Sequence, residues 1–382
     1  MAFKIIAEDG KARVGKLKTA HGTVETPFLM PVATKATVKN MSPMELKEIG
    51  AGAIISNSML LSCRPGSDFL KEMGGIHKFM NYDGVIFTDS GGFQMQSKNL
   101  FIKITDKGVW FRNPYTEQKT FFTPEKVMQI EQDIGPDVAM VLDHMPHVTQ
   151  SKKDVAAATK RTHEWAVRCK KEHDELKESA DKMRSKQLLF GIAQGGTDSR
   201  LRKKSAEFIE SIDFDGVAMG GLCLGESKTA MFKAVDVQIP VFNPDKIRYL
   251  MGVGTPVDLI EAISHGVDCF DSIFPTQNAR HLNVFTSKGM LKLYKTIYRA
   301  DLSPVDEECD CYTCKNFTRA YLSHLHRVDE KIVHRYLTYH NVYFVQKMMK
   351  NIREAIKEGN FSEFKKKFLK KFNDGKALHN NK

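Results

Sequence analysis

The sequence predicts an α/β protein built as a (β/α)8 TIM barrel, with an N-terminal β segment and a C-terminal helical subdomain. Two observations favour the barrel. Short apolar runs, each long enough for one buried parallel strand, alternate with amphipathic stretches of helical period. Their number also fits a barrel better than a doubly wound sheet, although periodicity alone does not separate the two. The runs are residues 53–56, 84–90, 137–143, 188–194, 216–221, 247–254 and 266–272, with an eighth expected at 283–286.

The segments around these runs define the rest of the organisation. Residues 23–32 are expected to belong to a small β meander ahead of the barrel, and the amphipathic helices between strands include 124–135, 151–176 and 256–266. After residue 302 the sequence contains helical segments and no further buried-strand runs. We therefore expect a barrel domain over residues 1–302 and a C-terminal subdomain over residues 303–382.

Composition excludes several classes of protein. The chain has 382 residues, of which 42% are hydrophobic and 27% charged, so disordered and fibrous classes do not fit. It contains no apolar run long enough to span a membrane and does not begin with a signal-peptide pattern. We expect a cytoplasmic protein without membrane contact. The net charge of +11 makes a partner that carries phosphates the first to suspect.

Part of this charge lies at the C-terminus. Residues 361–382 hold seven lysines, and Phe364, Phe368 and Phe372 recur every four residues among them. This spacing predicts an amphipathic basic helix. A helix docked on the protein with a solvated lysine face and a helix that binds RNA phosphates both fit the pattern.

A cysteine cluster is the strongest local motif. Cys309, Cys311 and Cys314 place three thiols within six residues, which is typical of a tetrahedral zinc site completed by a histidine. Three thiolates and one imidazole leave no open coordination position, so the single Zn²⁺ would be structural. The candidates for the fourth ligand are His324, His326, His334 and His340.

Polar residues gather at the ends of the predicted strands. These are Asp89-Ser90-Gly91-Gly92, Asp143, Gln194-Gly195-Gly196, Gly220-Gly221 and Asp271. Each alone is more typical of a helix cap or turn. In a barrel, however, the carboxyl ends of all strands face one mouth, so together they predict a site. Several carboxylates at one mouth suggest chemistry at a glycosidic bond, as in a zinc-stabilised barrel glycosidase.

The motifs and their order resemble the tRNA-guanine transglycosylases, the queuine/preQ1 tRNA-ribosyltransferases of bacterial type. The resemblance runs from about residue 4 to 358. The matching segments are TDSGGFQ (88–94), LD (142–143), AQGG (193–196), AMGGL (218–222), RYLMGVGTP (248–256), FDSIFPT (270–276), CDCYTC (309–314) and YHN (339–341).

The resemblance implies a reaction and its partners. Such an enzyme exchanges guanine at the wobble position (34) of GUN-anticodon tRNAs, those for Asp, Asn, His and Tyr, for a 7-deazaguanine base, preQ1 or queuine. Asp271 would attack C1′ of the ribose and form a covalent glycosyl-enzyme, and Asp89 would act as general acid and base. The resemblance also implies that His340 is the fourth zinc ligand and that the enzyme is a homodimer.

The same resemblance assigns binding residues. Ser90, Asp143, Gln194, Gly221 and Leu222 would read the edge of the base, and Phe93 and Met251 would sandwich its faces. Gln277, where the family has arginine, and Arg280 would contact the RNA, whereas Leu224 and Met145 would narrow the pocket and favour the smaller base. The alternatives are a homologous transglycosylase acting on another nucleic acid or base, and a subunit of a heteromeric RNA-binding complex.

Overall fold

Eight parallel strands form a barrel at the centre of the protein. The computed structural model describes residues 2–92, 97, 99–146 and 149–380. The strand order is β4-β14-β13-β12-β11-β10-β6-β5, and a parallel bridge between Val32 and Ile55 joins the two ends. The strands are β4 (Phe28–Pro31), β5 (Ala53–Asn57), β6 (Val85–Asp89), β10 (Val138–Met140), β11 (Leu188–Ala193), β12 (Gly216–Met219), β13 (Ile247–Leu250) and β14 (Cys269–Ser272). The predicted barrel is confirmed.

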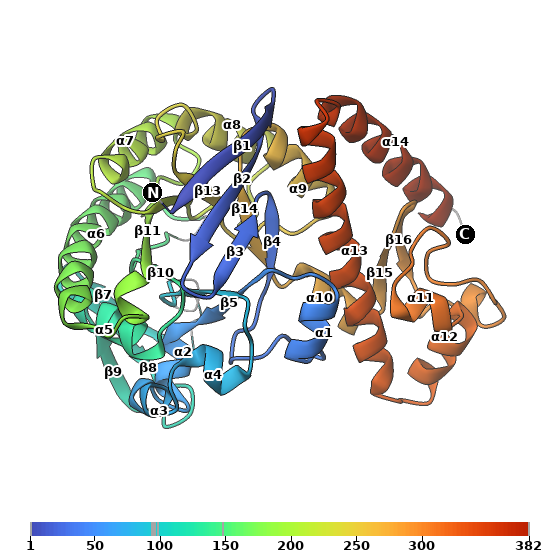
Figure 1. The fold of residues 1–382 in the computed structure, drawn as a ribbon, viewed down its shortest axis with the longest axis horizontal. Coiled ribbons are helices and arrows are strands. Elements are labelled where there is room, and N and C mark those ends of the chain that lie inside the picture. The colour runs from blue at the N-terminus through green and yellow to red at the C-terminus, as the bar shows by residue number, and fades with distance from the viewer. Residues whose placement is uncertain (1, 93–96, 98, 147–148, 381–382) are drawn as a thin grey trace.

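Helices surround this barrel (Figure 1). Those before residue 281 are α1 (Pro43–Glu48), α2 (Ser58–Cys63), α3 (Ser67–Glu72), α4 (Ile76–Met80), α5 (Pro124–Ile134), α6 (Lys152–Ser179), α7 (Ser199–Glu210), α8 (Lys228–Gln238), α9 (Pro256–Ser264) and α10 (Phe274–Arg280). The three helices named from the sequence correspond to α5, α6 and α9. Their first residues follow Thr123, Ser151 and Thr255, whose side-chain oxygens accept a backbone N–H of the first turn and so fix where each helix begins.

Two predicted strands are placed differently in the structure. An antiparallel sheet of β1 (Phe3–Asp9), β2 (Ala12–Thr19) and β3 (Gly22–Glu25) precedes the barrel, but residues 28–31 then form β4, a barrel strand, and not the end of a meander. Residues 283–286 form β15 (Asn283–Thr286), which pairs with β16 (Gly289–Lys292) as a hairpin outside the barrel. The apolar run in β4 has four residues and follows β3 closely, so its pattern does not distinguish a meander from a new sheet.

A further antiparallel sheet was not predicted. It consists of β7 (Phe101–Thr105), β8 (Gly108–Arg112) and β9 (Lys119–Phe122), and it lies in the chain between β6 and α5. Its outer strands are partly exposed, which is why they lack a continuous apolar run. Trp165 of α6 is buried and donates a 2.8 Å hydrogen bond to the Asp106 carbonyl, which ties the sheet to the barrel helices.

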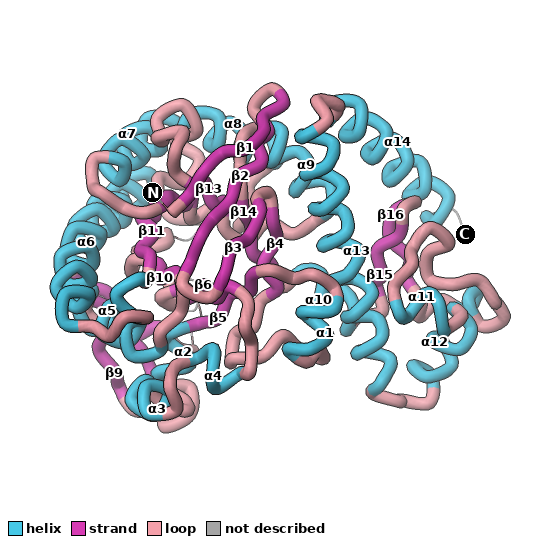
Figure 2. The backbone as a smooth tube through the Cα atoms, viewed as in Figure 1, coloured by secondary structure: helices cyan, strands magenta, loops and turns pink. Residues whose placement is uncertain are grey.

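The C-terminal region is helical, as predicted (Figure 2). Its helices are α11 (Tyr312–Asn316), α12 (Arg319–Arg327), α13 (Ile332–Lys357) and α14 (Phe361–Asn380). Helix α13 packs on the barrel, where Gln346 and Arg353 donate hydrogen bonds to the carbonyls of Leu29 and Pro27. A second apolar cluster, from Ala279 to Leu337, contains residues on both sides of position 302, so the proposed division at this position stays a prediction.

Helix α14 is docked on the protein. Phe372 is buried, and Lys365 forms a 2.9 Å ion pair with Glu261 of α9. Lys371 pairs with Glu308. The docked alternative for the basic helix therefore holds in the structure. In the described part of the chain, none of the helices combines the length and the hydropathy that a membrane span requires.

Candidate active site and metal centre

A cavity of about 410 Å³ opens at the carboxyl ends of the barrel strands. The topology brings together here residues that are far apart in the sequence, as expected for a barrel mouth. Its lining includes Asp89, Ser90, Asp143, Gly221, Leu222, Met251 and Asp271. Phe93 lies outside the described residues. The predicted convergence of carboxylates at one mouth is therefore present.

Asp89 is held at the end of β6 by its neighbours. The Asn57 amide and the Gly91 backbone N–H both donate to its Oδ1, the latter at 2.9 Å, and the Ser58 hydroxyl donates to its carbonyl at 2.9 Å. Burial raises the pKa of Asp89 to about 7, and the nearby negative charge of Asp271 adds to this effect. Near neutral pH this carboxyl is thus poised to carry or release a proton.

Asp271 at the end of β14 has a different environment. Its Oδ1 accepts a 2.6 Å hydrogen bond from the Tyr249 hydroxyl and a 2.9 Å hydrogen bond from the Gly252 N–H. Burial raises the pKa of Asp271, while these two donors act in the opposite direction because they stabilise the carboxylate. One oxygen of an ionised Asp271 is therefore fixed, and both donors favour the charged form.

Asp143 lines another side of the cavity, and the buried Gln194, which does not itself line the cavity, pairs with it. The Gln194 Nε2 donates to Asp143 Oδ2 at 2.5 Å, and burial raises the pKa of Asp143 to about 6. Gln194 is fully buried, and its Oε1 has no hydrogen-bond partner among the described residues. A Cβ atom on Gly221 would approach this Oε1 to 2.2 Å, so only glycine fits there. A buried amide with a free acceptor favours a ligand that donates a hydrogen bond.

The other predicted base-contact residues lie around the same space. The Ser90 hydroxyl donates to the Val141 carbonyl at 2.9 Å, which leaves its oxygen free to accept. Leu222 is buried and Met251 half-buried. Leu224 and Met145 also line the cavity.

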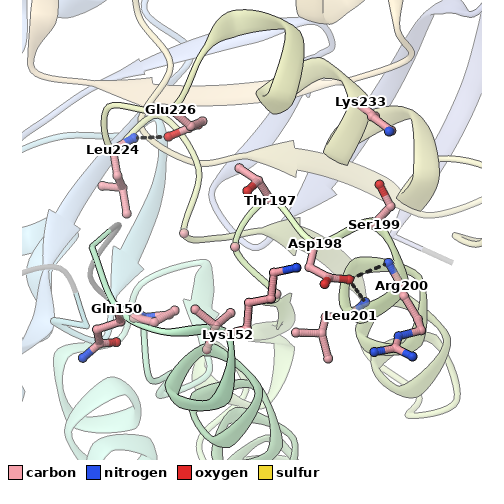
Figure 3. Close-up of a pocket in the computed structure, with 15 residues that line it drawn as sticks. Gln150, Lys152, Thr197, Asp198, Ser199, Arg200, Leu201, Leu224, Glu226 and Lys233 are labelled. Carbon is pink, nitrogen blue, oxygen red and sulfur yellow. Dashed lines mark hydrogen bonds between the residues drawn. The ribbon is translucent and has the colours of Figure 1, made fainter.

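A second cavity of about 480 Å³ adjoins the first and shares Gly221 and Leu224 with it (Figure 3). The starts of α6 and α7 contribute to its wall, together with Lys233 from the middle of α8. The carboxylate of Asp198 caps α7 and accepts from the Arg200 and Leu201 backbone N–H groups, as the dashed lines in Figure 3 show. Glu226 similarly accepts from the Leu224 N–H at 2.9 Å. The mouth therefore has more space beside the base-sized cavity.

The predicted RNA-contact residues lie in the helix that follows the strand of Asp271. Both lie in α10, where Gln277 is exposed and Arg280 half-buried. Neither lines the cavity that holds Asp89 and Asp271. The side chain of Gln277 is thus accessible next to the mouth.

The cysteine motif and His340 converge. The Sγ atoms of Cys309, Cys311 and Cys314 lie 3.7, 3.4 and 3.3 Å from the His340 Nδ1. The other ring nitrogen, Nε2, is 2.7 Å from the Phe285 carbonyl. If Nε2 carries the proton for this bond, Nδ1 is free to bind a metal. Of the four candidate histidines, His340 is the one whose ring reaches the thiols among the described residues, and the cluster is consistent with a metal site.

Sequence reasoning missed several residues that support the site. Asn57 and Tyr249 hold the two catalytic candidates, but within strands they look like ordinary buried residues. Glu131 of α5 is fully buried beneath Asp89 and accepts a hydrogen bond from the Thr88 hydroxyl. A carboxylate inside an otherwise apolar helix face was the available signal for Glu131.

A histidine pair at the opposite end of the barrel was also missed. The rings of His21 and His77 stack 3.5 Å apart, and each is within 3.0 Å of the Asp137 carboxylate. Asp137 also accepts from the Ile86 N–H, and the histidine contacts contribute to a pKa of this carboxyl well below its usual range. Because the two rings are stacked nearly parallel, their nitrogen lone pairs do not converge on one point, as they would in a metal site. The contacts of both rings with Asp137 instead join the N-terminal sheet to the barrel.

Comparison with known proteins identifies the family. The sequence profile of the family described as Queuine tRNA-ribosyltransferase matches residues 8–374. The chain belongs to this family. A queuine tRNA-ribosyltransferase of Desulforamulus reducens is 48% identical over 365 residues, covering 96% of both chains. One of Francisella tularensis subsp. tularensis is 44% identical over 369 residues, covering 97% of this chain and 98% of the relative. The family resemblance of the motifs is therefore confirmed over nearly the whole chain.

Proposed function

We propose that this protein is a tRNA-guanine transglycosylase. It exchanges guanine at the wobble position of GUN-anticodon tRNAs for a 7-deazaguanine base, as part of queuosine modification. The observation that carries this proposal is the placement of Asp89 and Asp271 in one cavity, where burial and the negative charge of Asp271 raise the pKa of Asp89. Family membership supports the identity of the substrates.

The environments support a division of labour. Asp271 is the nucleophile, because two donors favour its charged form and leave its second oxygen free to attack C1′, whereas the pKa of Asp89 is raised further by the negative charges of Asp271 and Asp143. The C1′–N9 bond breaks as the bond from the Asp271 oxygen to C1′ forms. Asp89 is the general acid, because its pKa near 7 lets it carry a proton to the departing guanine at neutral pH.

The second half of the reaction reverses these roles. The incoming base binds in the same cavity, and the ionised Asp89 removes the proton from its ring nitrogen as that nitrogen attacks C1′. The bond from C1′ to Asp271 breaks as the bond to this nitrogen forms, which restores the carboxylate. Two displacements at one carbon retain the β configuration. The wobble nucleotide has to leave the anticodon stack to reach the floor of the mouth.

Base recognition follows from the other cavity residues. We assign the edge of the base to Ser90, Asp143, Gln194, Gly221 and Leu222, and one face to Met251, with Phe93 as its expected counterpart. The free acceptor of Gln194 suits an exocyclic amine or ring N–H of guanine. A base that lacks this donor would leave a buried acceptor unpaired and so be rejected. Leu224 and Met145, which line the cavity, are proposed to favour preQ1 over queuine.

The cysteine cluster is proposed to hold one structural Zn²⁺. With Zn–S about 2.3 Å and Zn–N about 2.0 Å, a tetrahedral site separates sulfur and nitrogen ligands by about 3.5 Å. The three Sγ–Nδ1 distances of 3.3–3.7 Å fit this value. Bound zinc would join the loop before α11 to α13 without taking part in the chemistry, because four protein ligands leave it no open position.

The remaining partners are also proposals. The exposed Gln277 and the neighbouring Arg280 are proposed to contact the anticodon loop beside the mouth. A homodimer and a cytoplasmic location are proposed from family membership alone. Light scattering on the purified protein would test the dimer.

The experiment that tests the function is exchange of labelled guanine into a GUN-anticodon tRNA. The matched control is the same tRNA with the wobble guanine replaced by adenine, which should take up no label. A chase with preQ1 and with queuine then shows which base displaces the label. Absence of exchange with folded, zinc-loaded protein would overturn the proposal.

A further inference from the structure

Arg202 is a fully buried arginine that no part of the mechanism above uses. It lies in the first turns of α7, with none of its side chain accessible to solvent. Its Nε donates to the Gly196 carbonyl at 2.6 Å, and its Nη1 donates to the Ala193 and Gly220 carbonyls at 3.1 and 2.8 Å. Its Nη2 donates to the Gly221 carbonyl at 3.2 Å. One guanidinium thus binds four backbone carbonyls.

These carbonyls belong to two loops of the active site. Ala193 ends β11 immediately before Gln194, Gly196 lies in the loop that follows, and Gly220 and Gly221 follow β12. In the described structure, every hydrogen bond that Arg202 makes is to a backbone carbonyl and none is to a carboxylate. Burial lowers the pKa of Arg202 to about 9, which reflects the cost of placing a cation there. An apolar side chain of similar length would fill the space without this cost. Packing alone therefore does not explain why an arginine that binds four carbonyls stands at this position.

The geometry of the peptide bond supplies one. In a planar trans peptide the C=O of one residue and the N–H of the next point in opposite directions. When Arg202 binds the carbonyls of Gly220 and Gly221, the N–H groups of Gly221 and Leu222 are turned away from α7. Both residues line the cavity on the inner side of the barrel wall. The contacts therefore fix which backbone groups face the base.

Gln194 is held from the same helix. Its backbone N–H donates to the Ser205 hydroxyl of α7 at 3.0 Å, and the preceding carbonyl, that of Ala193, binds Arg202. The Gln194 side chain lies against Gly221, where a Cβ atom would approach its Oε1 to 2.2 Å. A small rotation of either loop would bring these atoms into conflict or separate them. The two loops must keep a fixed relation for the amide and the peptides to act together.

We propose that Arg202 is a positioning residue for base recognition: it joins the loops after β11 and β12 so that Gln194, Gly221 and Leu222 present their polar groups to the base. It does not touch the base itself. This inference rests on the proposed function, since it concerns the same cavity. Misplacing reactive or binding groups by about 1 Å costs roughly 100-fold in rate. Loss of Arg202 should weaken several hydrogen bonds to the base at once, so the KM for the free base should rise by ~10-fold to 100-fold.

The test uses Arg202→Ala in the full-length, zinc-loaded enzyme. We expect the KM for free guanine to rise while the KM for tRNA, whose other contacts lie outside this cavity, changes less than about twofold. Guanidinium ion at non-denaturing concentration should restore the KM for guanine, and urea at the same concentration should not. Arg353→Ala is the matched control: Arg353 also donates to a carbonyl, that of Pro27, but lies away from the mouth. This control should keep the wild-type KM for guanine and show no rescue.

Other outcomes would overturn the inference. A folded Arg202→Ala enzyme with the wild-type KM for guanine would show that the loops hold their positions without the guanidinium. Equal losses in the KM for tRNA and for guanine, without rescue, would show a general structural role. If the alanine variant does not fold, Arg202→Lys is measured instead, because one ammonium cannot reach all four carbonyls, and an unchanged KM for guanine would again contradict the proposal. Exchange by the wild-type enzyme in the same assay separates this result from failure of the proposed function.

Discussion

Replacing Asn57 with leucine should raise the pKa of Asp89 and extend exchange activity to higher pH. The Asn57 amide donates to Asp89 Oδ1 and thereby stabilises the ionised carboxylate. Leucine has nearly the same size and offers no donor. Without this bond the charged form is less stable, so the proton is lost at a higher pH.

The size of the effect follows from the strength of such bonds. A hydrogen bond to a charged group contributes about 1.5–3 kcal/mol, and one pKa unit corresponds to 1.36 kcal/mol. The Gly91 N–H remains as a second donor, so the lower end of this range applies. We expect the pKa of Asp89 to rise from about 7 by about one pH unit.

The assay is the pH dependence of kcat/KM for tRNA, which reports the first half of the reaction, measured from about pH 5 to 9. The general acid must be protonated, so the wild-type rate should fall as pH rises through the pKa of Asp89. In Asn57→Leu this fall should occur about one pH unit higher. If this fall in rate stays at the same pH in the variant, or moves to lower pH, the assignment of Asp89 as the general acid is refuted.

Asn57 also caps α2, because its Oδ1 accepts from the Leu60 N–H at 2.7 Å. Loss of this cap costs about 1 kcal/mol of stability in addition to the electrostatic effect. Thr318→Ala is a matched control, since the Thr318 hydroxyl caps α12 by accepting from the Tyr321 N–H at 3.2 Å and lies in the C-terminal region. Thr318→Ala should lower the free energy of unfolding in urea by a similar amount without changing the pH at which the rate falls.

Three further predictions concern stability. Asp137→Asn should lower the free energy of unfolding in urea by ~1–3 kcal/mol with little change in KM, because a fully paired carboxylate loses its charge. Since the pKa of Asp137 is lowered in the folded protein, the ionised carboxylate stabilises the fold above about pH 4, and this stabilisation is lost as the pH falls further. Wild-type stability that does not decrease on acidification below about pH 4 would contradict this role of Asp137. Cys311→Ser with verified zinc loss should lower Tm, and an unchanged Tm in calorimetry would refute a structural zinc. Phe372→Ala should cost ~3–5 kcal/mol of stability and leave tRNA affinity unchanged, whereas weaker filter binding of tRNA by the folded variant would show that the docked face of α14 also serves the RNA.

The sequence predicts the barrel because its strands are buried on both faces and so appear as continuous apolar runs. It predicts that the carboxylates meet in one cavity for a topological reason, since all strand ends meet at one mouth. It misplaces residues 28–31 and 283–286 because runs of four residues carry no information about which sheet they join. The sheet of residues 101–122 was missed because half-exposed edge strands lack such runs.

The supporting residues could not be predicted for a different reason. Asn57, Tyr249 and Arg202 act through contacts with residues distant in the chain, and in the sequence they are ordinary members of a strand or helix. The histidine that completes the cysteine cluster shows the same limit. Spacing allowed four histidines, and the family resemblance and the folded chain both select His340.

The most direct test of the mechanism is to identify the atom that carries the ribose. A GUN-anticodon tRNA is incubated with the enzyme without free base, the complex is denatured and digested, and peptides are analysed by mass spectrometry. We expect a nucleotide attached to the peptide that contains Asp271, and no adduct from Asp271→Asn, which should still retain tRNA in a native gel. An adduct on a peptide containing Asp89 or Asp143, or one that persists in Asp271→Asn, would contradict the assignment of Asp271 as the nucleophile.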